Sequence, residues 1–141
     1  MDRMFLLVLA LMAAPVYGQG LCAPYWKAHP TVDVRVANGN VIQVSEATIE
    51  TDCTETALAW WITDQRYEFP DKDVAPGITI RDMNGNPTDD HDCFRALDTR
   101  WFQCTKKNHH SSKQYKYTVN VLDTQTNKLV DPPLDPFIHN K

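Results

Sequence analysis

The chain has 141 residues, of which 23% are charged, and its formal net charge is -4. Such a mildly acidic composition excludes proteins that bind nucleic acids or anionic membranes through a broad basic surface. The length suits a single domain with one modest core.

The chain begins with a pattern typical of a secretory signal peptide. Arg3 precedes an apolar run from Met4 to Ala14, and small residues follow the run. We expect cleavage after Gly18, with Gly20 as the alternative. Residues 1–18 are then the signal peptide, and residues 19–141 form one mature domain.

The apolar run also bears on the compartment. It holds about eleven residues, fewer than the roughly 20 that span a bilayer as a helix, and no second apolar stretch follows it. We therefore expect a periplasmic or secreted protein with no membrane span.

Four cysteines fall in the mature part of the chain, and an even number in an exported domain of this size indicates two disulfide bonds. They are Cys22, Cys53, Cys93 and Cys104. Three pairings are possible. We favour Cys93 with Cys104 and Cys22 with Cys53, because neighbours along the chain close smaller loops.

The first mature element is a hairpin over residues 32–44. Val32, Val34 and Val36 alternate with polar residues, and apolar residues resume at Val41 after Asn-Gly-Asn. An Asn-Gly pair between two such runs is a strong hairpin signal, because both residues tolerate positive φ.

The next segment, residues 54–65, leaves helix and strand open. As a helix it would place Ala57, Leu58, Trp61 and Ile62 on one face. As a strand it would place Leu58, Trp60 and Ile62 on one face and Ala57, Ala59 and Trp61 on the other, which suits a strand buried on both sides.

Strand signals dominate the rest of the chain. Residues 77–80 (GITI) and 115–123 (YKYTVNVLD) predict strands, residues 123–128 predict a hairpin turn, and residues 134–140 predict a final short strand. Frequent Pro, Gly, Asn and Asp between these segments favour an all-β fold, an antiparallel β-sandwich stapled by disulfides.

Several motifs occur in an order that resembles small bacterial domains of the DP-EP type, whose function is not established. They are Trp60 to Ile62, Phe69-Pro70, Gly77 to Ile80, Asn108, Tyr115 to Val121 and Asp135 to Asn140. The resemblance implies an Ig-like or cupredoxin-like sandwich and a strand at residues 54–65. The segment RDMNGNPTDDHDC and the cysteines depart from that pattern.

The stretch Gln103–Gln114 (QCTKKNHHSSKQ) is the richest in potential metal ligands. Cys104, His109 and Gln114 have the spacing C-x4-H-x4-Q, which resembles the ligand loop of blue-copper proteins. A copper site needs a cysteine thiolate and two imidazoles. Upstream of Asp90, the mature chain offers only His29 as the second imidazole. Copper binding is therefore the alternative hypothesis.

Three other interpretations compete for this region. A zinc site would gather His91, Cys93, Cys104 and His109, with His110 as a spare. The closely spaced ligand pairs typical of zinc sites, C-x2-C or H-x3-H, are missing. An EF-hand calcium loop at Asp82, Asn84 and Asn86 fails, because Pro and Cys occupy its Gly and Glu positions. In the third, residues 105–113 are a solvated loop after a disulfide-bonded cysteine. We favour the solvated loop, and so expect no cofactor.

No catalytic motif is present, neither G-x-S-x-G, H-E-x-x-H nor a glycine-rich phosphate loop. We therefore expect an exported binding module, not an enzyme, whose partner is an unknown protein or cell-envelope component. An inhibitor or immunity protein would be a special case. Tyr67, Phe69 and Trp101 are the candidate contact residues, since exposed aromatic residues often anchor interfaces.

Overall fold

The computed structural model describes residues 27–141, which form β-strands and contain no helix. The expected signal peptide, both candidate cleavage sites and Cys22 lie outside the described residues. Within residues 27–141, no helical segment has the length and apolar character needed to cross a membrane.

The largest sheet has six strands. In the order β3-β2-β5-β9-β8, its strands are β3 (Val41–Val44), β2 (Val32–Ala37), β5 (Glu55–Ile62), β9 (Trp101–Lys106) and β8 (His91–Arg95), and β1 (Lys27–Ala28) also pairs with β5. Both β1 and β2 run parallel to β5, whereas the other pairs are antiparallel. The sheet is therefore mixed.

A second sheet has four strands in the order β4-β13-β10-β7. They are β4 (Thr48–Thr51), β13 (Phe137–Asn140), β10 (Gln114–Val119) and β7 (Ile78–Asp82). A small third sheet joins β6 (Tyr67–Glu68), β11 (Leu122–Asp123) and β12 (Lys128–Leu129). In the four-stranded sheet, β4 and β13 are parallel, so the expected antiparallel sheets are corrected to two mixed sheets in which most strand pairs are antiparallel.

The predicted hairpin over residues 32–44 is confirmed. Strands β2 and β3 pair antiparallel, from the pair Ala37 and Val41 next to the turn to the pair Val34 and Val44. Asn38 and Gly39 lie in the turn with φ values of 54° and 74°, the left-handed conformation that Asn and Gly adopt most easily.

Residues 54–65 contain strand β5, so of the two interpretations the strand is confirmed. Leu58, Trp60 and Ile62 are at most 1% exposed, and the alternate residues Ala57, Ala59 and Trp61 are half-buried. The period of two fits a strand, and the face formed by Leu58, Trp60 and Ile62 supplies the core.

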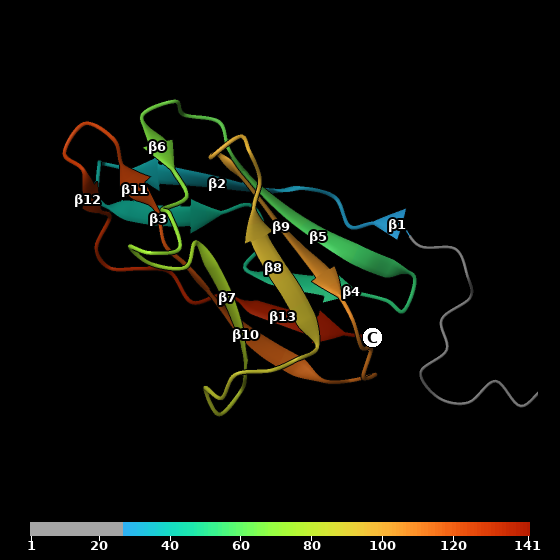
Figure 1. Ribbon diagram of the computed structural model, residues 1–141. Helices are drawn as coiled ribbons and strands as arrows, with labels where there is room; N and C mark the ends of the chain where they lie inside the picture. The colour runs from blue at the N-terminus through green and yellow to red at the C-terminus, as the bar shows by residue number, and fades with distance from the viewer. Residues whose placement is uncertain (1–26) are drawn as a thin grey trace, which may run out of the picture.

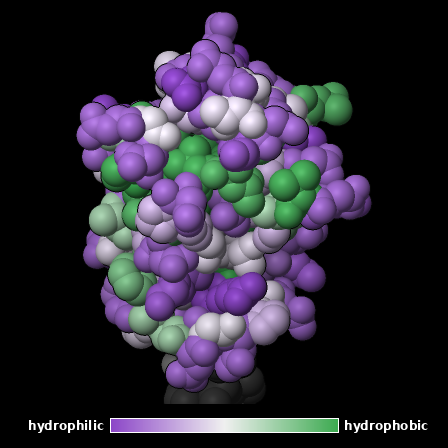
Figure 2. Space-filling view, turned by 90° about the vertical axis from the view of Figure 1, so that its left-hand side faces the viewer, coloured by the Kyte–Doolittle hydropathy of each residue, from purple (hydrophilic) through white to green (hydrophobic). Residues whose placement is uncertain are grey.

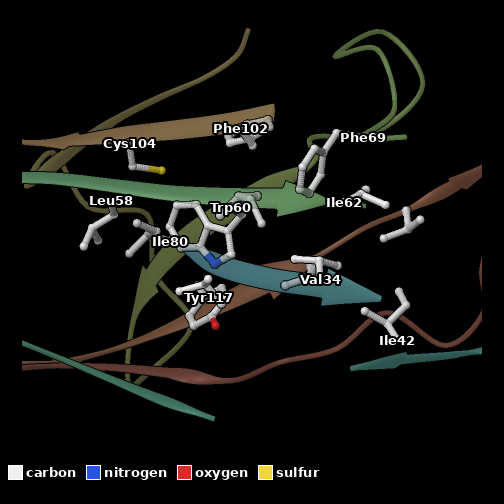
Figure 3. Close-up of a cluster of buried hydrophobic side chains, with 14 of the residues drawn as sticks. Val34, Ile42, Leu58, Trp60, Ile62, Phe69, Ile80, Phe102, Cys104 and Tyr117 are labelled. Atoms are coloured by element: carbon white, nitrogen blue, oxygen red, sulfur yellow. The ribbon is translucent and has the colours of Figure 1, made fainter. Parts of the chain in front are cut away.

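The core lies between the two larger sheets. Trp60 of β5 lies against Tyr117 of β10, with 5.4 Å between ring centroids, and Figure 3 shows Val34, Ile62 and Phe69 around the pair. Because Trp60 and Tyr117 belong to different sheets and are both 0% exposed, the two sheets face each other across this core.

The favoured pairing of Cys93 with Cys104 is confirmed. The bond joins directly opposite residues of β8 and β9. Cys53 is also disulfide-bonded, and no cysteine in the described part of the chain is free. The predicted partner of Cys53 is Cys22, which is not among the described residues.

Candidate functional site

The candidate site lies where the edges of the two larger sheets meet. Strand β8 ends the six-stranded sheet and β7 ends the four-stranded sheet, and the two strands run next to each other (Figure 1). No strand of residues 27–141 pairs with the outer edge of β8, and no backbone ladder joins β7 to β8.

Two adjoining hollows, each about 330 Å³, follow this line. They share Pro76, Ile78 and Cys93, and we call them together the seam groove. At one end the lining residues are Pro70, Asp71, Lys72, Gly77, Phe94, Arg95 and Phe102. At the other end they are Thr79, Ile80, Arg81, Pro87, Thr88 and His91.

Gly77 lets the chain come close to the core at the start of β7. A Cβ atom at this position would lie 2.8 Å from Cε2 of Phe102 and 3.1 Å from Cβ of Phe69. Both distances are shorter than an ordinary contact between carbon atoms. The floor of the groove is therefore formed by Gly77 packed onto a buried phenyl ring.

The groove is more cationic than the protein as a whole. Arg95 donates to the carbonyl of Phe69 at 3.1 Å and pairs with Asp71 at 3.2 Å. Lys72 and Arg81 have no ion pair within residues 27–141. Three cations and one carboxylate thus line a groove on a protein whose net charge is -4.

His91 lines the groove as a neutral imidazole. Burial, together with the charge of Lys106, lowers its pKa to about 4. The ring lies edge-on to Tyr115 with 4.9 Å between centroids, and neither ring nitrogen has a hydrogen-bond partner among the described residues. At neutral pH the ring carries one donor and one acceptor, and both nitrogens are buried behind the groove lining.

Asp90 anchors the loop that follows β9. Its carboxylate accepts hydrogen bonds from Tyr115 Oη at 2.7 Å and from Lys113 Nζ at 3.0 Å, and His110 Nε2 lies 3.3 Å from it. Burial alone would raise the pKa of Asp90, but these hydrogen bonds outweigh it and hold the pKa far below its usual range. The loop is therefore fixed through a buried charge.

The structure does not assemble the predicted copper ligands. Cys104 is 0% exposed and bonded to Cys93, so it offers no thiolate. His109 places Nδ1 3.2 Å from Lys106 Nζ and Nε2 3.0 Å from the carbonyl of Lys141. Gln114 is exposed on β10.

The other predicted metal ligands are also engaged. Both nitrogens of His29 face carboxylates, with Nδ1 2.9 Å from Glu55 and Nε2 3.1 Å from Glu46. The zinc interpretation needs Cys93 and Cys104, which form the disulfide. Within residues 27–141, no group of three or more His, Cys, Asp or Glu side chains is arranged to hold a metal ion.

Two of the three residues predicted to contact a partner are buried, which contradicts the prediction for them. Tyr67 is 3% exposed and Phe69 is 0% exposed, the latter packed 5.3 Å from Phe102, so neither can anchor a partner directly. Trp101 is half-buried and lies 5.8 Å from Trp61.

Phe94, which is 51% exposed at the rim of the groove, was missed. The sequence did contain a signal for its exposure. Neighbouring residues on a strand point to opposite faces, so a disulfide-bonded Cys93 places the Phe94 side chain on the other face of the strand.

The side of the molecule that carries β11 and β12 is mostly hydrophilic, with a smaller apolar area near its middle (Figure 2). In the described chain, the large apolar side chains that are most exposed are spread over several elements. They are Val41, Val74, Met83, Phe94, Leu97, Leu129 and Phe137. Single exposed apolar residues are normal on protein surfaces, so only Phe94, beside a groove, is singled out.

No protein-family model matches the chain, and a search of the curated proteins finds no match either.

Proposed function

We propose that the protein is an exported, non-catalytic binding module and that its partner is an extended segment of another protein lying in the seam groove. The observation that carries this proposal is the position of the groove, along the edge of β8 that is unpaired within residues 27–141 and beside the edge strand β7. We further propose that the two larger sheets form an Ig-like or cupredoxin-like sandwich.

The size and lining of the groove support a peptide ligand. Each hollow is about 330 Å³, within the range of sites that hold small ligands or side chains. The five residues of β8 span roughly 14 Å at about 3.4 Å per step, which matches four or five residues of an extended segment.

The charge of the groove indicates which side chains the bound segment should carry. Lys72 and Arg81 are exposed and form no ion pair in the described chain, whereas the floor is apolar at Ile78 and Phe102. The segment that suits this lining carries apolar residues next to at least one Asp or Glu.

Export is supported by two features. The amino-terminal pattern is typical of a signal peptide. A disulfide between Cys93 and Cys104 suits an oxidising compartment. A periplasmic or secreted protein of the DP-EP type therefore remains our proposal, although that resemblance indicates no ligand.

The test is a selection from a phage library of random peptides, about twelve residues long, on the immobilised mature protein with its disulfides intact. We expect enriched peptides to combine apolar and acidic residues. The affinity of one synthetic peptide is then measured by fluorescence polarisation.

Two variants locate the site. Phe94→Ala removes the exposed ring at the rim of the groove and is expected to weaken binding by about tenfold, as for an interface anchor. Leu97→Ala removes a fully exposed apolar side chain outside the groove and should leave affinity unchanged. A library without enrichment, or equal losses in both variants, would overturn the proposal.

A further inference from the structure

We infer that the bound segment joins the six-stranded sheet as an additional strand along the free edge of β8. This inference rests on the proposed function of the seam groove. It adds the mode of recognition, in which main-chain hydrogen bonds hold the segment and the groove selects its side chains.

The hydrogen bonds beside β8 show which backbone groups are free. Ala96 donates to the carbonyl of Trp101 at 3.0 Å, and Lys107 donates to the carbonyl of Asp90 at 2.7 Å. In an antiparallel pair such bonding residues alternate with residues that do not bond to the partner strand. Asp90 and Ala96 are bonded, so the residues at odd positions between them direct their groups away from β9.

The disulfide supports the same assignment. Cys93 and Cys104 are directly opposite, with only 4.0 Å between their Cα atoms. Short Cα separations belong to the pairs that do not exchange hydrogen bonds. The N–H and C=O groups of His91, Cys93 and Arg95 therefore point towards the free edge, and the disulfide holds this register in place.

The edge of β7 is less available than that of β8. Arg81 forms an isolated antiparallel bridge with Pro87, and Asp82 donates to the carbonyl of Asn86 at 3.0 Å. Residues following β7 thus already occupy the end of its outer edge. The edge of β8 has no such partner in the described chain along His91–Arg95.

The groove then distinguishes the two faces of the added strand. His91, Cys93 and Arg95 share the face of β8 that lines the groove, together with Ile78 and Ile80 of β7. Alternate side chains of the segment would enter this apolar lining.

The first experiment uses one peptide from the selection, re-synthesised with a single N-methyl group at each position in turn. An added strand presents alternate N–H groups to β8. We expect methylation at every second position to weaken binding at least tenfold and methylation at intervening positions to have little effect. Tolerance at every position, or losses without alternation, would overturn strand addition.

The second experiment follows amide hydrogen exchange of the mature protein by NMR. Peptide binding should slow exchange of the Cys93 amide, whereas the Phe94 amide, already bonded within the β8–β9 ladder, serves as the control. An unchanged Cys93 amide at saturating peptide contradicts the inference. Protection that rises with protein concentration and without peptide would instead assign the edge to a second copy, and would also overturn it.

These results separate the two proposals. A peptide that binds, is weakened by Phe94→Ala and tolerates N-methylation throughout supports the groove as the site and rejects strand addition. The absence of any binding peptide rejects the groove itself.

Discussion

His91 makes the stability of the protein depend on pH. Burial lowers its pKa to about 4 in the folded protein, against an ordinary value of 6.5. Between these values the unfolded chain binds a proton that the folded protein does not bind. The contribution of His91 to the free energy of unfolding is therefore constant above pH 6.5. It decreases as the pH falls from 6.5 to 4.

Replacing His91 by Phe should remove this dependence. Urea unfolding is measured at pH 7 and at pH 4.5. Between these values the unfolding free energy of the wild type should fall by on the order of 2 kcal/mol more than that of the variant. His139→Gln, on β13, serves as the control and should keep the wild-type loss. Equal losses in wild type and His91→Phe would show that another group causes the decrease.

Lys106 is a second buried residue that titrates, and it changes the stability of the protein in a different pH range. Its side chain is 7% exposed and donates to Thr51 Oγ1 at 2.7 Å and to the carbonyl of Asp52 at 3.2 Å. Burial lowers its pKa to about 8, despite nearby carboxylates. Between pH 8 and 10.5 the unfolded chain keeps a proton that the folded protein has lost, so stability from this residue increases with pH.

Lys106→Met keeps the length of the side chain and removes its charge. At pH 7 we expect an unfolding free energy equal to that of the wild type or higher by on the order of 1 kcal/mol, because a buried charge is costly. The rise between pH 8 and 10.5 should disappear. Thermal unfolding at pH 7 and pH 9.5 checks both, with Lys107→Met at the exposed neighbour as control. A marked loss at pH 7 would show that the hydrogen bonds outweigh the cost of burial.

At the scale of elements, the disulfide between β8 and β9 holds the edge of the larger sheet. It closes a loop with a sequence separation of 11. The chain-entropy relation gives a stabilisation of about 3 kcal/mol for a loop of this length. The double variant Cys93→Ala/Cys104→Ala should lose that amount in urea unfolding, with Phe94→Ala as the control in the same strand. An unchanged midpoint would mean that the β8–β9 turn constrains the unfolded chain already.

The elements that sequence could predict are those with local signals. The hairpin at residues 32–44 has both alternation and an Asn-Gly turn, and the final strand follows Asp135-Pro136. Residues 54–65 carry conflicting local signals, because Ala57 and Leu58 favour a helix while the Leu58, Trp60 and Ile62 alternation favours a strand. Pairing on both sides, with β2 and β9, decides for the strand.

At the scale of the whole molecule, Trp60 connects the two larger sheets through its contact with Tyr117. Trp60→Ala should lower the unfolding free energy by about 4 kcal/mol, a large share of the stability of a domain of this size. Trp61→Ala, on the half-buried face of the same strand, is the matched control and should lose less than half as much. Chemical unfolding of both variants tests this, and similar losses would contradict the assigned core.

The site was harder to predict than the fold. The stretch Gln103–Gln114 has the residue types of a metal site, yet Cys104 is in a disulfide, and the ring nitrogens of His109 lie within hydrogen-bond distance of Lys106 and of the carbonyl of Lys141. The seam groove depends instead on which strands end the two sheets. Sequence shows that strands exist but contains no local signal for their order, so neither β7 nor β8 could be identified as an edge.

The position of β13 has a consequence for biogenesis. This strand pairs with β4 on one side and with β10 on the other, and Asn140 accepts a hydrogen bond from Thr51, 89 residues earlier. The four-stranded sheet therefore lacks an inner strand until the ribosome has added residues 137–140. If the chain is exported as we propose, a precursor that enters the translocation channel before residues 137–140 have been added cannot yet have completed this sheet.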